Sequence, residues 1–211
     1  MKIYLHENDL PADLNFVSEN FKGEVAVDTE AMGLKTERDR LCLIQISEGN
    51  GDCHLVQFLP ESFSSLKTPN LKRLFENPNV LKIFHFARFD VTIIKKYLDI
   101  KIAPLFCTKI ASKIARTYTD QHGLKNLCKF FLNLEISKQQ QTSDWGNPVL
   151  TQEQLSYAAT DVLYLHKLKG ALEALLIREG RLELAEGCFA FLPTIASLEA
   201  QGFNADEILK Y

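Results

Sequence analysis

Residues 24–30 read EVAVDTE, an apolar and β-branched run followed by Gly33, and this stretch decides the fold. Its composition is typical of a buried strand. Asp28 and Glu30 are two residues apart in it, so both carboxylates project from the same face of that strand. The strand is otherwise too apolar to leave two carboxylates there without a partner, and we therefore expect a cation beside them. The ordinary alternative is one carboxylate that caps a turn and another that meets a lysine.

Two further strands follow the first one closely. Residues 41–47 read LCLIQIS and lead to the turn sequence GNGD at 49–52, and residues 53–58 then read CHLVQF. Short apolar runs joined by tight turns are typical of antiparallel strands. We therefore predict that three antiparallel strands open the chain.

Helix and strand patterns alternate after residue 60. The segments are a helix at 62–75, a strand at 81–86, a helix at 89–98, a short strand at 102–106 and a helix at 108–117. Such alternation is typical of βαβ units with parallel strands. The expected fold is therefore α/β, with one mixed sheet whose strands are first antiparallel and then parallel, flanked by helices.

The rest of the sequence is predicted to be mainly helical. Helices are expected at 123–133 and 151–178, with a polar loop at 137–143 between them. The longer helix begins with Thr151 and Gln154, the pattern of a capping box, and Gly180 follows its end. The tail, about 181–211, is expected to be a helical extension with a break at Pro193, because proline interrupts a helix.

The composition is that of an ordinary globular protein. The 211 residues are 46% hydrophobic and 24% charged, which fits one domain. No apolar run approaches the roughly 20 residues of a membrane helix, and the first residues lack the apolar stretch of a secretory signal, so we expect a cytoplasmic protein with no membrane partner. The formal net charge of −3 argues against a protein that holds long nucleic acid by neutralising many phosphates. Any nucleic-acid substrate should therefore be short or gripped locally.

The cysteines indicate neither a disulfide framework nor a zinc site. They are odd in number, scattered and never spaced as C-x-x-C: Cys42, Cys53, Cys107, Cys128 and Cys188. We expect buried free thiols, because free cysteine behaves as a small hydrophobic residue.

Three further residues are candidates for chemistry. Asp90 stands where a predicted strand meets a helix, a place that commonly faces a site, although a first-turn acid favoured by the helix dipole is the alternative. Asp161 lies four residues after Tyr157, so the phenol and the carboxylate share one face of the long helix. Apolar neighbours turn that face inward, and a buried aspartate without a charge partner is costly. A metal ion is one explanation for Asp161.

Taken together, the four carboxylates of Asp28, Glu30, Asp90 and Asp161 would form an all-oxygen site that selects Mg²⁺ or Mn²⁺ over zinc. Two such ions roughly 4 Å apart would clamp the attacking and leaving oxygens of a phosphodiester. Tyr157 has an unperturbed pKa near 10 and is a poor general base at neutral pH. We therefore expect it to orient the attacking water rather than to remove its proton.

The order of these residues resembles a known superfamily. Asp28-x-Glu30, then HFARFD at 85–90, then Tyr157-x-x-x-Asp161 are similar to the three exonuclease motifs of the DEDD superfamily, in its tyrosine-containing branch. The sequences SDW at 143–145 and LTQEQLSYAATDV at 150–162 resemble the ribonuclease D group, and this likeness spans about 24–178. In one departure, ribonuclease D usually has an arginine just before the proline that follows its tryptophan, whereas this chain has WGNP at 145–148.

Over nearly its whole length the chain looks most like bacterial nanoRNase C, a family that removes nucleotides from very short RNAs, dinucleotides included. This resemblance implies a ribonuclease H-like fold, two divalent cations (Mg²⁺ or Mn²⁺), 5′-mononucleotide products and a closed ring of identical subunits, an octamer. It also implies one exonuclease domain over 1–211, with a catalytic core at about 24–178 and short single-stranded RNA as its partner.

The resemblance also suggests residues that contact the substrate. In the family, an apolar residue after the first acidic pair wedges between the last two bases, and Leu34, close to Met32 in the sequence AMGL, stands at that position. A core leucine is the alternative. His85, at a strand end, could donate to the terminal phosphate or ribose, and a purely structural histidine is the alternative.

Trp145, His122 and Lys125 are weaker substrate candidates. Trp145 is the single tryptophan and either stacks on a base or anchors its loop by its apolar area; we favour anchoring. His122 and Lys125 flank Gly123 and could grip the 5′ phosphate.

Two other functions remain open from the sequence. The first is a ribonuclease D-like enzyme that trims structured RNA tails, or a DNA exonuclease; the negative net charge weighs against it. The second is a catalytically silent binding or assembly module on the same fold, which the complete acidic set disfavours.

Overall fold

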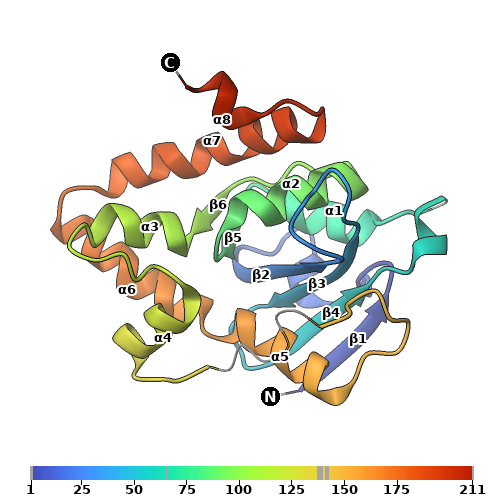
Figure 1. Cartoon of the computed structure of the whole chain (residues 1–211). Helices are drawn as coiled ribbons and strands as arrows, with labels where there is room; N and C mark the ends of the chain where they lie inside the picture. Colours follow the sequence, from blue (N-terminus) through green and yellow to red (C-terminus); the bar gives the residue numbers. More distant parts are fainter. Residues whose placement is uncertain (1, 65, 137–139, 141–142, 211) are drawn as a thin grey trace.

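The computed structural model describes residues 2–210 except 65, 137–139 and 141–142. Its centre is a six-stranded mixed sheet with the strand order β1-β4-β3-β2-β5-β6 (Figure 1). The strands are β1 (Ile3–Glu7), β2 (Gly23–Ala31), β3 (Leu41–Ser47), β4 (Cys53–Gln57), β5 (Val80–Phe84) and β6 (Leu105–Cys107). Every residue of β3 is buried, as expected for a strand covered on both faces.

The sheet confirms the predicted antiparallel strands and corrects their place in the chain. β2 pairs antiparallel with β3, and β3 pairs antiparallel with β4. β5 and β6 then add in parallel on the other side of β2. The prediction that these three strands open the chain was wrong, because β1 precedes them and pairs parallel with β4. β1 is an edge strand with no buried residue, and its five residues, IYLHE, are too few to give a clear strand pattern.

The helices agree with the predicted ones in order and differ at three places. They are α1 (Pro69–Glu76), α2 (Ala87–Leu98), α3 (Thr108–Ala115), α4 (Leu124–Leu132), α5 (Gln152–Leu163), α6 (Leu165–Arg178), α7 (Leu182–Ala200) and α8 (Ala205–Ile208), with short 3-10 helices η1 (Asn15–Val17) and η2 (Pro60–Ser64). The capping box of α5 is confirmed: the Gln154 backbone N–H donates to Thr151 Oγ1, and the Thr151 N–H donates to the Gln154 side chain. The loop predicted at 137–143 lies largely outside the described residues.

The three differences concern where helices break. The helix predicted at 62–75 is divided into η2 and α1, because Pro69 starts a new helix at its first position, where a missing N–H costs nothing. The helix predicted at 151–178 is divided at Tyr164, which separates α5 from α6. The predicted break at Pro193 is absent, since α7 runs through this residue. Its buried residues, among them Phe189 and Leu192, hold α7 against the body despite the proline.

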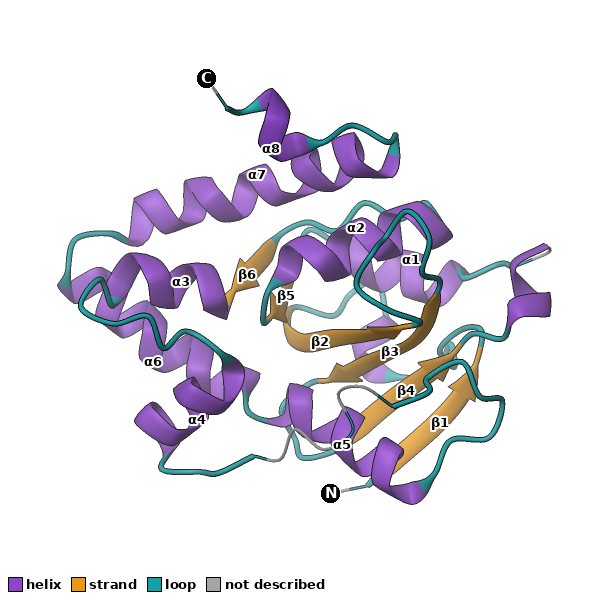
Figure 2. Cartoon of the chain, viewed as in Figure 1, coloured by secondary structure: helices purple, strands orange, loops and turns teal. Residues whose placement is uncertain are grey.

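The helices lie on the two sides of the sheet (Figure 2). α5 lies against β2, β3 and β4, and α6 lies against β2 and β5. α2 lies on the β5 side of β2, where the second half of β2 has no neighbouring strand among the described residues. α7 packs along α2 on the side away from the sheet. The arrangement leaves the end of β2 between α2 and α5, since β2 pairs with β5 only from Gly23 to Ala26.

Two smaller predictions can be compared with the described residues. Cys42, Cys53, Cys107 and Cys128 are buried free thiols as predicted, whereas Cys188 is exposed. Within the described ranges, we find no helix with the length and apolar character that a bilayer crossing requires.

Candidate active site

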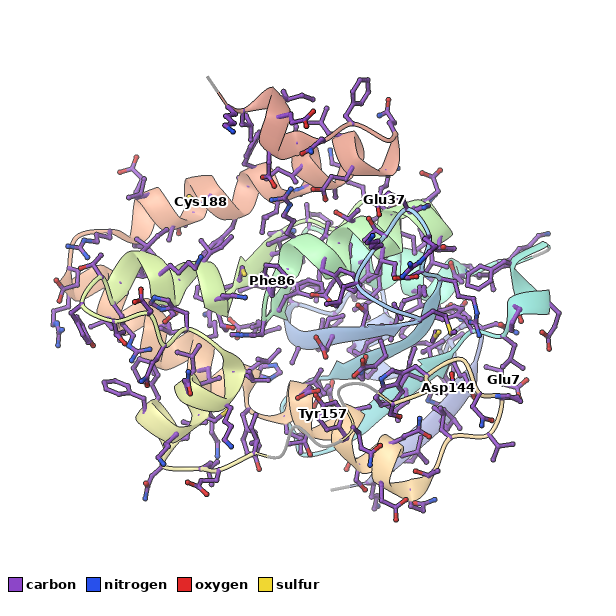
Figure 3. The ribbon with its side chains drawn as sticks, viewed as in Figure 1. Glu7, Glu37, Phe86, Asp144, Tyr157 and Cys188 are labelled. Atoms are coloured by element: carbon purple, nitrogen blue, oxygen red, sulfur yellow. The ribbon has the colours of Figure 1, made fainter. Side chains whose placement is uncertain are left out.

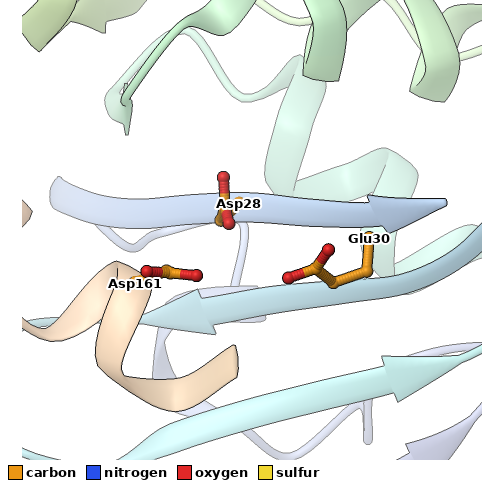
Figure 4. A group of neighbouring side chains, drawn as sticks. All are labelled: Asp28, Glu30 and Asp161. Atoms are coloured by element: carbon orange, nitrogen blue, oxygen red, sulfur yellow. The ribbon is translucent and has the colours of Figure 1, made fainter. Parts of the chain in front are cut away.

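Three of the predicted carboxylates meet at the end of β2. Asp28 and Glu30 come from β2 and Asp161 from α5, and one oxygen of each lies within 4.8 Å of the other two (Figure 4). Residues two apart on a strand share a face, which places Asp28 and Glu30 side by side, and α5 brings Asp161 onto that face. The structure thus joins residues that are more than 130 positions apart in the sequence.

Asp90 lies next to this group but not within 4.8 Å of all three of its carboxylates. It occupies the first turn of α2 and is buried, and its Oδ1 accepts a 2.6 Å hydrogen bond from the Thr29 hydroxyl on β2. Its charge raises the pKa of both Asp28 and Glu30, which shows that it faces the same cluster. The first-turn position predicted as an alternative is therefore real, and the residue also belongs to the acidic group.

The carboxylates of the cluster have no lysine or arginine ion-pair partner among the described residues. Burial, followed by the charges of the neighbouring carboxylates, raises the pKa of Asp28 and Glu30 well above their ordinary values. Burial likewise raises the pKa of Asp90 and Asp161 to about 7. Among the described residues, the ion pairs of lysine and arginine are all made elsewhere. A set of close, desolvated oxygen ligands fits a hard divalent cation, which would remove the repulsion that raises these pKa values.

Tyr157 supports this cluster from α5. Its hydroxyl donates a hydrogen bond to Asp161, one helical turn away. Burial, and then the charges of Asp161, Glu30 and Asp28, raise the pKa of Tyr157 above its ordinary value. The phenol therefore stays protonated at neutral pH, which agrees with the predicted orienting role.

Gln45 is a residue of this site that the sequence analysis did not single out. It stands opposite Asp28 in the β2–β3 register, so both side chains lie on the same face of the sheet. Gln45 is fully buried, and neither polar atom of its amide has a hydrogen-bond partner within the described part of the chain. A buried amide without a partner is costly and points to a polar site on this face. The available signal was an amide in the middle of an otherwise apolar strand.

The loop after β2 presents Leu34 and Met32 to solvent. Leu34 is 88% exposed, which excludes the alternative of a core leucine, and Met32 is also exposed. The loop is held by Asp39, whose carboxylate accepts hydrogen bonds from the Lys35 N–H and from Arg38. A Cβ at Gly33 would lie 2.3 Å from the Asp39 carboxylate, so a larger residue there would displace this side chain.

His85 and Phe86 lie at the opposite side of the site, where β5 ends. His85 Nδ1 lies 2.9 Å from the Thr108 hydroxyl, which donates its own proton to the Phe84 carbonyl. A hydroxyl has one proton, so Nδ1 is the donor to Thr108 in the tautomer that keeps the Thr108–Phe84 hydrogen bond. Phe86 has a left-handed backbone (φ 72°) and an exposed ring, and Lys109 Nζ lies 3.9 Å from the ring centroid. Figure 3 shows Phe86 and Tyr157 on opposite sides of β2.

The remaining candidates differ in accessibility. Trp145 is 3% exposed and packs 6.1 Å from the Tyr157 ring, centroid to centroid, so its burial agrees with anchoring and leaves no free face for a base. His122 Nδ1 lies 2.9 Å from the Ser112 hydroxyl, and Lys125 is exposed on α4. In the described ranges, neither residue shares an ion pair or hydrogen bond with the acidic cluster.

Fold and site together define the class of protein: a ribonuclease H-like α/β protein whose central strand and two flanking helices bring together carboxylates that could hold a cation. A model of the 3′-5′ exonuclease family matches residues 3–177, and the chain belongs to this family.

Individual relatives narrow the position of the chain within the family. It is 36% identical to ribonuclease D of Acidiphilium cryptum over 159 residues, which are 75% of this chain and 39% of that protein. It is 46% identical to the structure of Brucella melitensis NrnC with bound Mg²⁺ (TM-score 0.89, all of both chains), and 47% identical to that of Brucella melitensis NrnC bound to pGG (TM-score 0.90, 100% of this chain and 99% of that one). The chain spans less than half the length of the ribonuclease D relatives that it matches. The resemblance to ribonuclease D-like exonucleases and to nanoRNase C is thereby confirmed.

Proposed function

We propose that this chain is a metal-dependent 3′-to-5′ exoribonuclease that hydrolyses short oligoribonucleotides, dinucleotides included, to 5′-mononucleotides. The observation that carries the proposal is the convergence of Asp28, Glu30 and Asp161, with Asp90 beside them. The similarity over the full length to a protein solved with Mg²⁺ and with pGG supports the cation and the short substrate.

The four carboxylates are the proposed ligands of two divalent cations, Mg²⁺ or Mn²⁺. When bound, the cations supply positive charge at the scissile phosphate and ease the loss of a proton from water. Asp28, Glu30 and Asp161 offer oxygens within 4.8 Å of each other, a spacing that fits shared ligation. The Thr29 hydroxyl holds Asp90 in a fixed rotamer next to them. In this proposal the four carboxylates act as ligands of the cations and do not exchange protons with the substrate.

Tyr157 and His85 are proposed to orient the reacting groups. The Tyr157 hydroxyl is fixed by Asp161 and can accept a hydrogen bond from the attacking water. This hydrogen bond would align a lone pair of the water oxygen with the phosphorus. The His85 ring is fixed through Thr108, at the carboxyl end of β5, where it can meet the terminal phosphate or ribose. Positioning of this kind lowers the barrier by removing unproductive orientations before the reaction.

Leu34 is proposed to wedge between the last two bases of the substrate, for which we propose short RNA. Its side chain is free of the core and stands on the loop that leaves the end of β2. The net charge of −3 also disfavours long nucleic acid, because a long substrate is held mainly by phosphate contacts. Trimming of structured RNA and DNA hydrolysis are therefore the weaker candidates. A catalytically silent binding module is also weaker, because the acidic cluster is complete.

We further propose that the protein works as a homo-oligomeric ring. Exposed apolar side chains concentrate from the end of α6 onward, and surface groups of this kind often mark subunit contacts. They are Ile177, Leu184, Phe191, Phe203, Ile208 and Leu209. Light scattering should give a mass several times that of one chain, and eight times for an octamer; a monomer would contradict this proposal.

A cleavage assay tests the function. A 5′-labelled diribonucleotide, a labelled 20-mer RNA and a labelled deoxydinucleotide are incubated with the protein in Mg²⁺ or in EDTA. We expect the diribonucleotide to be cleaved fastest, and only with the metal. Asp28→Ala should abolish cleavage, whereas Asp13→Ala, which removes an exposed carboxylate outside the acidic cluster, should not. Activity in Asp28→Ala would refute the site, and preference for the 20-mer or for DNA would refute the substrate.

A further inference from the structure

The C-terminal helices are joined to α2 by a cluster of ionic hydrogen bonds. Glu199, at the end of α7, accepts from Arg88 Nε at 2.8 Å and from the second Arg88 nitrogen, Nη2. Its other oxygen accepts from the Thr92 hydroxyl at 2.7 Å. Arg88 also donates to Asp206 on α8 at 2.8 Å. We call Glu199, Arg88 and Thr92 the tail clamp.

The two α2 residues of the tail clamp bracket Asp90. Arg88 and Thr92 are four positions apart and therefore lie on one face of α2. Asp90 is two positions from each, a rotation of about 200°, which puts it on the opposite face. That face is tied to β2 by the hydrogen bond from Thr29 to Asp90. The first turn of α2 is thus fixed from both sides, by β2 and by α7.

The tail clamp has the burial and geometry that a positioning contact needs. The Glu199 side chain is only 18% exposed, and three donors satisfy its two oxygens. Hydrogen bonds to an ionised and partly desolvated carboxylate are stronger and more directional than neutral ones. α7 also packs along much of α2, so the clamp acts on an element already held by apolar contacts.

We propose that Glu199 is a positioning residue of the active site: through Arg88 and Thr92 it sets the height and rotation of α2, and so the place of Asp90 among the other carboxylates. α7 lies beyond the residues that the exonuclease family model matches, so this chain builds part of its site from outside the family core. The inference rests on the proposed function only where activity is the readout.

The test compares Glu199→Gln with Glu207→Gln. Glutamine keeps the shape of residue 199 but removes its charge and turns one acceptor into a donor that faces Arg88 or Thr92. Glu207 is exposed, on the neighbouring helix α8, and gives the same change of charge. Each full-length variant is compared with the unmodified protein for kcat, KM, the Mg²⁺ concentration at half-maximal activity, Mn²⁺ affinity by calorimetry and thermal unfolding.

We expect Glu199→Gln to lower kcat by about 10-fold and to weaken Mn²⁺ binding by about 10-fold, the scale seen when groups that orient metal ligands are changed. KM should stay within about 2-fold, and Glu199→Asp should recover part of the loss. Glu207→Gln should match the unmodified protein. A purely structural role would lower the melting temperature and the active fraction without changing the metal requirement of the folded molecules.

Two results would overturn the inference. One is a Glu199→Gln protein with unchanged kcat and Mn²⁺ affinity; the other is a loss of activity that parallels the unfolded fraction, with metal affinity intact. If the unmodified protein cleaves no dinucleotide, the proposed function fails, while the Mn²⁺ affinities still decide whether Glu199 positions Asp90.

Discussion

The two faces of α2 show opposite ways of using a carboxylate. On the sheet side, Asp90 joins Asp28, Glu30 and Asp161; burial raises the pKa of each, and the neighbouring carboxylate charges raise those of Asp28 and Glu30 further. On the tail side, Glu199 and Asp206 meet Arg88. There the hydrogen bond from Arg88 lowers the pKa of Asp206 below its ordinary value.

This difference separates a site from a structural contact. Carboxylates that are paired with arginine stabilise the fold as they stand, whereas like charges held together destabilise it until a cation arrives. Strain of this kind persists only where the surrounding structure enforces it, which is typical of functional sites. The contrast therefore predicts opposite responses on the two faces of α2 to mutation, to pH and to metal.

The largest effect is expected from neutralising one carboxylate of the site. Asp161→Asn should reduce turnover by at least about 10³-fold, the scale of removing a group that stabilises transition-state charge. The metal-free protein should nevertheless melt higher, by about 2–4 °C for each kcal/mol of repulsion removed. Cleavage assays and calorimetric melting in EDTA measure the two changes. A lower melting temperature would mean that Asp161 is a stabilising contact, and the contrast would be lost.

A second large effect is the pH dependence of stability without metal. Asp90 and Asp161 have a pKa of about 7 in the folded protein against 3.8 ordinarily, so the folded state holds their protons more tightly than the unfolded chain. The stability that they contribute is present below pH about 4 and is lost as pH rises through about 7. In EDTA the melting temperature should fall over this range, and saturating Mg²⁺ should remove the fall. A melting temperature in EDTA that rises steadily across this range would contradict the raised pKa values.

An intermediate effect is expected from Tyr157→Phe. The change removes one hydroxyl that is fixed by Asp161, and we expect kcat to fall by about 10- to 100-fold with little change in KM. Because the pKa of Tyr157 is raised, the pH-rate profiles of both proteins should have the same shape up to pH about 10. A basic limb that disappears in the variant would show that the phenol acts as a base.

The sequence predicts the acidic site well because each motif obeys a local rule. The two-residue spacing of Asp28 and Glu30 predicts a shared strand face, and the four-residue spacing of Tyr157 and Asp161 predicts a shared helix face. The order of these motifs then resembles a known family, and this resemblance implies that they meet in the folded protein. Gln45 was missed because its position opposite Asp28 depends on the register between β2 and β3, which cannot be read from the sequence.

Other features depend on contacts that leave no periodic pattern. The tail clamp joins Glu199 to Arg88, which are 111 positions apart in the sequence. No local sequence pattern distinguishes either residue from an ordinary charged residue on the surface. β1 was missed because its five residues are too few to give a clear strand pattern, and α7 continues through Pro193 because packing outweighs a local helix breaker. Local rules find the elements and the face that each presents, whereas long-range pairing decides which faces meet.

The smallest effect is expected at the outer end of the tail side, in Asp206→Asn. Asp206 is 74% exposed and bonds to Arg88, so solvent screens the pair and its loss should lower the melting temperature by no more than about 2 °C. Because the pKa of Asp206 is lowered in the folded protein, this small contribution is present above the ordinary pKa and disappears as pH falls through the folded value. The difference between variant and unmodified protein should therefore be seen at pH 7 and disappear as the pH falls below the ordinary carboxyl pKa, and added salt should shrink it. The sign is opposite to that of Asp161→Asn, so melting both variants in EDTA at pH 7 compares the two faces of α2 directly. A rise in melting temperature for both would place Asp206 among the repelling carboxylates and would refute the distinction between the faces.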